Sequence, residues 1–587
     1  MTVQRWQTRE ASVLAVWLIA AAALLAIWGR LIAGLDASDA DDYMRLAQVR
    51  DLLAGQSWFD VHQYRMGPAT GVDMHWSRLV DMPIAAFLWL FRLVLPEPTA
   101  SAAAMTTVPL AQLLLVMVLT RRVIIALGAP PTTGLIGAAL VPLFPFLLTN
   151  FAPLRIDHHG WQAIGALACA LLILSRTRWA PLLGGAVAAA WLTVSLEGLP
   201  LVALLAALYG VRYLLRGERG LGGFLAALAG SSVALFLLTR PISAAALPLC
   251  DQLSWPQAGA FAAAAVVAVI APLLPWQDHL AGRLVALAAI GLAAFAVVVP
   301  ALGACALDPW ARLDPLIRAR WLSRVPEGMP VTHQALSTAV MLLWTMLLAV
   351  AGWWSGRGKA PDRERWDAYG LFTLVAGLLS LLVMRGGITA QILTVPFAAV
   401  LVARLLPRAR AVESTLPRVL ATVACLLLLT PLFVTAAAKL VDMRIAAAAH
   451  AATPRPAIGP EANAPVCDVA QLNRLPRSRV FALLGLGPEI LIRTPHSVVA
   501  SNYHRDPAGI RDALEAFGGD PVRAEAIVRR ERAAYVVFCA GDPEASVHAE
   551  VRPDNLANRL LAGKPPAWLT LLSGFRGGLG VYRVARE

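Results

Sequence analysis

The stretch "PLRIDHHGW", from Pro153 to Trp161, stands between two long apolar runs of the chain. It places one carboxylate and two imidazoles, those of Asp157, His158 and His159, beside a segment apolar enough to cross a bilayer. Ionisable side chains at such positions are costly, so they mark a functional site by default. The stretch therefore predicts a membrane protein with a ligand-like cluster at the end of one span.

The rest of the chain has the composition of a polytopic α-helical membrane protein. Of its 587 residues, 58% are hydrophobic and 15% are charged. Segments of roughly 18 or more nearly uncharged residues recur along most of the sequence, which is typical of bilayer-spanning helices. The net charge of +13 comes mainly from arginines in short loops, without a basic stripe of interleaved aromatic residues. We therefore expect no nucleic-acid partner and attribute this charge to membrane topology and anionic head groups.

Apolar windows and the breakers between them predict about thirteen spans. The first run, Val13 to Ile32, is too long for the core of a signal peptide and is interpreted as a retained span. The spans are expected near residues 12–33, 103–120, 131–150, 160–175, 179–195, 198–211, 221–239, 257–274, 284–304, 335–353, 367–384, 388–406 and 416–438.

Loop charges give these spans an orientation. Arginines gather in alternate loops, on the same side as Arg5 and Arg9. By the positive-inside rule that side, with the N-terminus, is cytoplasmic. An odd number of spans then places the C-terminal tail outside, which is the periplasm for the inner membrane of a Gram-negative bacterium. Three loops, at about residues 34–100, 150–160 and 305–334, are external in the same orientation and carry the polar motifs.

The composition changes after about Val441, where charged residues, Gly and Pro become frequent. The segments "SRVFAL", "HSVVAS" and "AAYVVFC" are typical of strands, whereas "PAGIRDALEAF" and "PVRAEAIVRRE" are typical of amphipathic helices. We therefore expect a transmembrane domain over residues 1–440 and a mixed α/β extracytoplasmic domain over residues 441–587. An oxidising compartment would allow two disulfides, with unpaired thiols as an equal alternative: Cys467 with Cys539, and Cys250 with Cys305.

The first external loop opens with an acidic motif, "DASDADDY", in which Asp36, Asp39, Asp41 and Asp42 lie within seven residues. A carboxylate cluster at a membrane surface suits a hard divalent cation such as Mg²⁺ or Mn²⁺, which proteins often share with substrate phosphates. The alternative is a solvated loop whose aspartates cap the following helix, for which Asp41 or Asp42 is well placed. The motif by itself is compatible with both interpretations.

Asp157 and His159 form a D-x-H motif whose two side chains can reach one ion from a helix-entry turn. A carboxylate with an imidazole suits Mn²⁺, Mg²⁺ or Zn²⁺. The alternative is that Asp157 caps a helix while both histidines face the head-group layer. Both motifs are predicted on one face, and each supplies ligands that the other lacks. We therefore favour one divalent-metal site that the two motifs share.

Together, "DASDADDY" and "RIDHHG" resemble the motifs of the catalytic subunit of oligosaccharyltransferases, in the GT-C glycosyltransferase superfamily. The resemblance implies the same number of spans and an external C-terminal domain. It also implies that Asp41, Asp157 and His159 hold the divalent metal, Mg²⁺ or Mn²⁺, although the register leaves Asp39 or Asp42 as alternatives to Asp41. In the family the first-motif aspartate also engages the acceptor, so Asp41 and Asp42 are expected to be catalytic.

The resemblance extends to two further segments. The loop "SRVPEGMPVTHQ" is similar to the family's S-V-S-E-like segment, which implies that Glu327 helps to position acceptor and metal. Arg385, in "VMRGGITAQILTVPF", corresponds to a family arginine that contacts the lipid-linked phosphate, and a guanidinium matches phosphate oxygens. Without the resemblance, Glu327 is an ordinary loop acid and Arg385 a residue bound among head groups.

The family's W-W-D-Y-G motif, which recognises the hydroxyl of an Asn-x-Ser/Thr acceptor, is not kept. The matching stretch is Leu483 to Gly487, "LLGLG", where the two indoles and the carboxylate are missing. Polar residues follow instead and suggest a different acceptor surface, with a strand edge and polar loop as the alternative: His496, Asn502, Tyr503, His504 and Arg505. The acceptor is therefore expected to be a protein with another recognition rule, a glycan or a lipid.

These observations predict a GT-C glycosyltransferase that uses a lipid-linked sugar donor. It would transfer a sugar or oligosaccharide from a polyprenyl phosphate or diphosphate to the acceptor at the periplasmic face, with the lipid tail in the bilayer. The main alternative is a transporter or flippase for lipid-linked glycans, which would carry polar residues and broken helices at mid-span. A scaffold protein would leave both acidic motifs unexplained.

Overall fold

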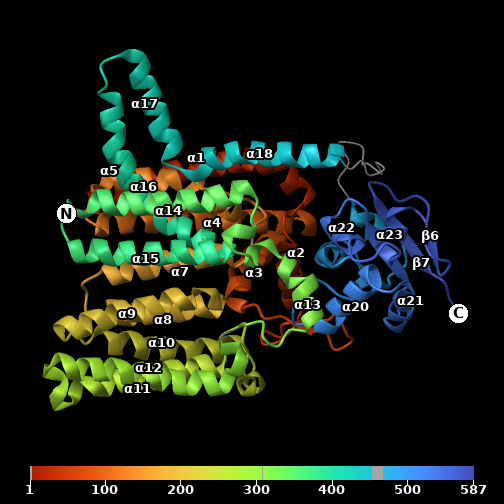
Figure 1. Ribbon diagram of the computed structural model, residues 1–587, viewed down its shortest axis with the longest axis horizontal. Coiled ribbons are helices and arrows are strands. Elements are labelled where there is room, and N and C mark those ends of the chain that lie inside the picture. Colours follow the sequence, from red (N-terminus) through yellow and green to blue (C-terminus); the bar gives the residue numbers. More distant parts are fainter. Residues whose placement is uncertain (1–2, 307, 453–466, 587) are drawn as a thin grey trace. The chain divides into compact units, whose positions relative to one another are not determined.

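The computed structural model describes residues 3–306, 308–452 and 467–586. The chain divides into two compact units (Figure 1). The helical unit comprises Met1–Asp36, Trp76–Ala311 and Val325–Ala447. The α/β unit comprises Ala37–His75, Arg312–Arg324 and Ala448–Glu587. Each unit is therefore assembled from segments that are far apart in the sequence.

The helical unit confirms the predicted class of polytopic α-helical membrane protein, because a helix lies at each predicted span. Among the described residues, eight helices are long and apolar enough to cross a membrane, three more are shorter but apolar, and one bent pair would add a span. The helices of this unit are α1 (Val3–Gly34), α3 (Arg78–Arg92), α4 (Glu97–Ala126), α5 (Pro131–Leu140), α6 (Pro145–Asn150), α7 (His159–Leu174), α8 (Ala180–Val194), α9 (Leu199–Arg216), α10 (Gly220–Thr239), α11 (Trp255–Ile270), α12 (Leu280–Leu302), α14 (Leu336–Arg357), α15 (Arg363–Leu382), α16 (Gly387–Arg410), α17 (Thr415–Leu428) and α18 (Pro431–Ala452).

Burial differs strongly among these helices. Figure 1 shows α7 to α12, α14 and α15 running alongside one another. The most apolar 18-residue window of Met384–Arg410, which contains α16, is 83% buried, whereas that of Leu280–Ala306, which contains α12, is 11% buried. An apolar helix with so little protein around it is expected where lipid is the surrounding solvent. The core of the helical unit thus lies around α16, where Trp366 and Tyr369 of α15 contact the buried ring of Phe397.

Small residues allow the closest helix packing. On α8, a Cβ atom added at Gly185 would lie 2.1 Å from the carbonyl oxygen of Phe224 and 2.7 Å from the nitrogen of Leu228, both on α10. Only glycine fits such an approach of two backbones, which is a recurrent device for helix association in membranes. The pair α8 and α10 is therefore held at a distance that a single methyl group would disturb.

Proline breaks two of the predicted spans. Near residues 131–150, α5 ends at Leu140, a short 3₁₀ turn covers Val141–Leu143, and α6 begins at Pro145. Near residues 416–438, α17 and the segment Pro431–Ala447 meet at an angle of 82°. A proline removes a backbone donor and disfavours helical geometry in the residue before it, so each helix ends just ahead of its proline.

The α/β unit is built on a five-stranded sheet of order β4-β3-β5-β7-β6. Strand β3 pairs in parallel with β4 and β5, and β7 pairs antiparallel with β5 and β6. The three predicted strands and two predicted helices are confirmed by β3, β4, β5, α20 and α21. The elements are β3 (Arg479–Ala482), β4 (Ser497–Val498), β5 (Tyr535–Cys539), β6 (Leu569–Leu571), β7 (Leu579–Val584), α19 (Gly487–Arg493), α20 (Pro507–Gly518), α21 (Pro521–Arg530), α22 (Pro543–Ala549) and α23 (Leu556–Leu561).

Two earlier segments of the chain complete the α/β unit. They are residues 37–75, with α2 (Ala40–Leu53), β1 (His62–Gln63) and β2 (Val72–Asp73), and residues 312–324, with α13 (Pro315–Arg320). The guanidinium of Arg65 donates to the carbonyl oxygens of Thr494, at 3.1 Å, and Leu491, and Met66 forms a parallel bridge with Val498. Residues 37–75 are thus part of the same unit as the C-terminal sheet.

Both cysteine pairs left open by the sequence are disulfide-bonded. Cys467 is joined to Cys539 of β5 in the α/β unit, and Cys250 is joined to Cys305 in the helical unit. The sequence positions of all four fall in segments that the predicted topology places outside. Disulfides persist mainly in oxidising compartments, and the orientation itself stays a prediction.

Candidate functional site

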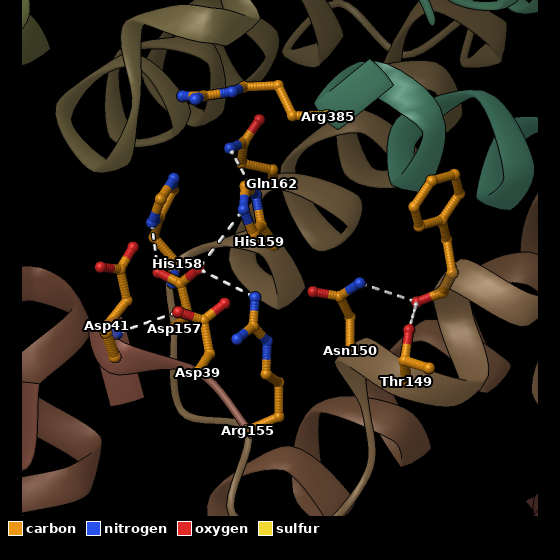
Figure 2. A network of polar contacts seen from close by, with 12 residues as sticks. Asp39, Asp41, Thr149, Asn150, Arg155, Asp157, His158, His159, Gln162 and Arg385 are labelled. Carbon is orange, nitrogen blue, oxygen red and sulfur yellow. Dashed lines mark hydrogen bonds and ion pairs between the residues drawn. The ribbon is translucent and has the colours of Figure 1, made fainter. Parts of the chain in front are cut away.

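The D-x-H motif lies at the first turn of α7, in the helical unit. His159 is the first residue of the helix and His158 is its N-cap residue, so Asp157 precedes the cap rather than forming it. Asp157 and His159 are buried, with exposed fractions of 3% and 7%. The Oδ2 atom of Asp157 lies 3.3 Å from Nε2 of His159, and its Oδ1 atom contacts Nδ1 of His158 (Figure 2).

The three side chains offer one ligand atom each within 4.8 Å of one another. His158, for which the sequence suggested only a head-group contact, is therefore part of the cluster, and its ring lies 4.3 Å from that of His159 between centroids. A carboxylate oxygen with one or two imidazole nitrogens is a donor set that Mn²⁺, Mg²⁺ or Zn²⁺ accepts. The chemistry and the spacing of the donors thus fit a divalent cation.

Asp157 is held in its ionised form. Burial opposes ionisation of this carboxyl, but the imidazoles of His158 and His159 and the guanidinium of Arg155 outweigh burial, so its pKa lies well below the usual range. Nη2 of Arg155 lies 3.5 Å from Oδ2 of Asp157. A carboxylate must be deprotonated to bind a metal, and this environment keeps it so.

A series of polar contacts runs from this cluster to Arg385. Nε2 of Gln162 lies 3.3 Å from Nδ1 of His159 and donates to Oε2 of Glu197 at 2.9 Å. Nη1 of Arg385 donates to Oε1 of the same carboxylate at 2.8 Å. These residues come from α7, from a 3₁₀ turn over Leu196–Gly198, and from another over Met384–Gly386. Packing of three spans thus places a predicted metal ligand and the predicted phosphate ligand in one network.

Glu197 and Gln162 were not predicted as site residues. A lone glutamate between two apolar segments, in "SLEGLP", was the available signal for Glu197. Gln162 gave no signal, because one amide in the first turn of a span is unremarkable in sequence. Both are recognised only once the first turn of α7 and the 3₁₀ turn ahead of α9 are placed next to each other.

Glu327 lies in the helical unit as well, in a 3₁₀ turn over Pro326–Gly328. Its carboxylate acts electrostatically on the imidazole of His159, as does that of Glu197. The same loop is tied to the turn that carries Arg385, because the backbone N–H of Met384 donates to the carbonyl oxygen of Met329 at 3.2 Å. The structure thus groups Glu327 and Arg385 with the D-x-H motif.

Three aspartates of the acidic motif, Asp39, Asp41 and Asp42, lie in the α/β unit at the start of α2, whereas Asp36 ends the first segment of the helical unit. Asp39 is the N-cap residue, and its Oδ1 accepts from the backbone N–H of Asp41 at 3.0 Å. The sequence favoured Asp41 or Asp42 for a capping role, and the cap is instead Asp39, which leaves Asp41 inside the first turn. The hydroxyl of Tyr503 donates to Oδ1 of Asp41 at 3.0 Å, while Asp42 is fully buried.

The proposed acceptor residues have different environments within this unit. His496 is fully buried, Ser478 N–H donates to its Nδ1 at 3.1 Å, and its Nε2 lies 3.0 Å from the carbonyl oxygen of Leu472. It is therefore an interior residue and does not contribute to a surface. Tyr503 reaches the acidic motif, and the ring of His504 lies 4.7 Å from that of His75. Arg505 pairs with Asp73 of β2 at 3.2 Å.

The stretch "LLGLG", Leu483 to Gly487, forms a 3₁₀ turn leading into α19. The backbone N–H groups of Leu484 and Gly485 donate to the carboxylate of Glu544, each at 2.9 Å. A Cβ atom on Gly487 would lie 2.9 Å from the side chain of Ser501, so close packing accounts for the one residue that matches W-W-D-Y-G. Packing thus explains this turn without reference to a hydroxyl-bearing acceptor.

No family model and no curated protein sequence matches the chain. Solved structures do. The archaeal oligosaccharyltransferase AglB from Archaeoglobus fulgidus, in complex with an inhibitory peptide and a dolichol-phosphate, aligns with a TM-score of 0.65 at 14% identity, covering 98% of this chain and 74% of that one. The fold is that of the archaeal oligosaccharyltransferase. The apo form gives the same values. A complex of that enzyme with Zn and sulfate aligns with a TM-score of 0.58 at 13% identity, covering 97% and 73%. The oligosaccharyltransferase-like fold predicted from the sequence is confirmed.

Proposed function

We propose that the chain is a membrane glycosyltransferase of oligosaccharyltransferase type. It transfers a sugar or oligosaccharide from a polyprenyl-phosphate-linked donor to an acceptor at the periplasmic face of a bacterial inner membrane. The observation that carries this proposal is the network that joins Asp157 and His159 to Arg385 through Gln162 and Glu197. It occurs in a chain with the fold of an enzyme whose solved structure contains a dolichol-phosphate.

Asp157 and His159 would hold the divalent cation, Mg²⁺ or Mn²⁺, together with Asp41 of the α/β unit. The fit rests on the buried, ionised carboxylate and on the 3.3 Å between its oxygen and the imidazole nitrogen. When bound, the cation supplies positive charge that stabilises the leaving phosphate. The convergence of Asp41 with the D-x-H motif stays a prediction, because the two motifs belong to different units.

Arg385 would bind the donor phosphate. Its Nη1 donates to Glu197, so the planar guanidinium is held at one corner in a defined orientation. A guanidinium carries five N–H donors in a planar fork whose geometry matches phosphate oxygens. Glu197 therefore acts as a positioning residue, and Gln162 links its carboxylate to the first turn of α7.

Asp41 would orient the nucleophile of the acceptor and take its proton, with Asp42 as the alternative and Glu327 as a further positioning residue. The hydrogen bond from Tyr503 fixes the carboxylate of Asp41. A base needs a defined direction toward the proton that it removes, and a bond to one oxygen supplies it. Because "LLGLG" lacks the indoles and carboxylate of the W-W-D-Y-G motif, the acceptor is a protein recognised by another rule, a glycan or a lipid.

The decisive experiment uses the purified full chain with a polyprenyl-diphosphate-linked oligosaccharide in detergent. Release or transfer of the glycan is measured with and without EDTA, for the wild type and for Asp157→Ala/His159→Ala. We expect cation-dependent turnover that the double variant lacks, while both proteins insert into membranes equally. Full activity in the double variant would reject the site. Metal-independent flux of the lipid-linked glycan across vesicles, without bond cleavage, would support the transporter instead.

A further inference from the structure

A polar cavity lies in the helical unit at the end opposite to the D-x-H motif. Its volume is about 280 Å³. It is formed by the loop between α7 and α8, the end of α9, the start of α10 and the start of α15. The D-x-H motif starts α7, and this loop follows its last residue. At 1.5 Å per residue, the 16 residues of α7 separate the two sites by about 24 Å.

Arginines outnumber carboxylates around the cavity, also when Asp362, which pairs with Arg176 and Arg365, is included. Four arginines and two glutamates line it: Arg176, Arg212, Arg216, Arg365, Glu218 and Glu364. The side chain of Arg212 is 17% exposed and that of Arg365 is 24% exposed, whereas Arg176 and Arg216 are 69% and 53% exposed. The wall thus has two partly buried guanidiniums and two that face the solvent or head-group side.

Ion pairs hold these guanidiniums in place. Glu364 accepts from Nε of Arg212 at 3.0 Å and pairs with Arg216 at 2.5 Å. Nη2 of Arg212 also donates to the carbonyl oxygen of Ile173 at 3.1 Å, and its guanidinium lies over the ring of Tyr209. Each guanidinium has five donors, and the pairs formed by Arg176 and Arg216 each use one terminal nitrogen. The site is therefore organised in advance and keeps donors for an added anion.

Two helix N-termini reinforce the positive potential. Ala180 and Pro181, which start α8, and Gly220, which starts α10, line the cavity. Pro181 has no N–H and that of Ala180 donates to the carbonyl oxygen of Thr177 at 3.0 Å, so these helix ends act through the positive end of the helix dipole, which favours an anion. The cavity thus combines fixed guanidiniums with oriented backbone dipoles, the combination that binds phosphate groups in proteins.

The residues around the cavity favour a phosphate group that belongs to a membrane lipid. Trp179 is 55% exposed and stacks under the guanidinium of Arg178, and Leu183 and Leu215 are 53% and 68% exposed. Exposed tryptophan and leucine beside arginines at the end of a span are typical of the membrane interface, where acyl chains would lie against the leucines. A soluble anion would need no such apolar rim.

We infer that this cavity binds the phosphodiester head group of an anionic phospholipid. Basic pockets between transmembrane helices on the cytoplasmic side are a known type of lipid site, and the loop arginines predict that this side is cytoplasmic. The site is separate from the donor-phosphate residue Arg385, which lies after α15, whereas the cavity residues Glu364 and Arg365 lie at the start of that helix. The inference therefore stands without the proposed glycosyl transfer.

The test is native mass spectrometry of the purified full chain with phosphatidylglycerol or phosphatidylcholine. We expect the wild type to retain phosphatidylglycerol. The variant Arg176→Gln/Arg216→Gln should bind this lipid about tenfold or more weakly, since each arginine near an anionic head group adds to the electrostatic attraction. The matched control, Arg408→Gln/Arg410→Gln at the end of α16, removes the same charge from the same predicted side outside the cavity and its rim, and it should bind like the wild type. Equal loss in the control would show diffuse surface charge and overturn the inference.

A third variant and a second probe complete the test of lipid binding. If the double glutamine variant does not fold, Thr177→Glu places a carboxylate at the exposed cavity rim without removing an ion pair, and it should also abolish selective retention. Inorganic phosphate is the second probe: displacement of phosphatidylglycerol by millimolar phosphate, or equal retention of phosphatidylcholine, would contradict a lipid head-group site. Selective retention of phosphatidylglycerol by the Thr177→Glu variant would also contradict a lipid head-group site.

Discussion

Substitution of Glu197 by glutamine tests the network that carries the functional proposal. The change keeps the shape of the side chain but removes the charge that faces Arg385 across 2.8 Å and Gln162 across 2.9 Å. Both members of the Arg385 pair are less than one-third exposed, at 26% and 29%, so solvent screens it only partly. Replacing a charge-assisted hydrogen bond by a neutral one costs about 1–2 kcal/mol. If that energy positions Arg385 in the transition state, kcat/KM falls about 5- to 30-fold.

The assay is donor and acceptor titration with the purified enzyme and a lipid-linked donor. The fall in kcat/KM should appear when the donor is titrated, and the KM for the acceptor should stay unchanged. Arg385→Gln alone should cost more than Glu197→Gln, and the double variant should be no worse than Arg385→Gln, because a residue that acts through another adds nothing once that other is gone. Glu413→Gln, at an exposed loop position, is the matched control. Additive losses in the double variant, or wild-type rates for Glu197→Gln, would refute the positioning role.

The other predictions address the metal, the acceptor side and the packing. Asp157→Asn should lower Mn²⁺ affinity by at least about tenfold in isothermal titration, since Asp157 supplies the carboxylate of the cluster that it forms with His158 and His159. Unchanged affinity would show that the metal binds elsewhere. Removal of metal with EDTA should stop turnover in the wild type, and added Mn²⁺ should restore it. Tyr503→Phe should lower kcat about 5- to 20-fold by freeing the carboxylate of Asp41, with membrane insertion intact. Gly185→Ala should destabilise the helical unit by about 1–3 kcal/mol because its methyl group meets the α10 backbone, measured as a lower Tm, whereas Gly230→Ala, with nothing within 4 Å, should be neutral.

Much of the fold could be predicted because it follows from local signals. Apolar length located the spans, and short apolar runs typical of strands located β3 and β5. The bend after α17 also had a local cause in Pro431, which an apolar window alone does not register. Disulfide pairing was left open, because cysteine positions do not determine which sulfurs meet.

The site could be predicted only where a motif is contiguous. Asp157 and His159 stand in one short stretch, and the structure keeps them together. Glu197 acquires its place from the packing of separate spans, so its contact with Arg385 is a property of the tertiary fold. The cap position at Asp39 is similar: several aspartates compete for it, and the backbone geometry at the start of α2 decides which one wins.

The assembly of the α/β unit from distant segments has a consequence for synthesis. Its first segment ends at His75 and its last begins at Ala448, so most of the membrane-spanning chain is made between them. At about 5–20 residues per second, the ribosome needs roughly 20 to 75 s to bridge that interval. During this time α2 and the loop containing Arg65 stand outside the membrane without the carbonyl groups near Leu491 and Thr494 that they later bind. A C-terminal fragment cut at Ala448 would lack these partners from the other side, so a complete copy of the α/β unit needs residues 37–75 and 312–324 as well.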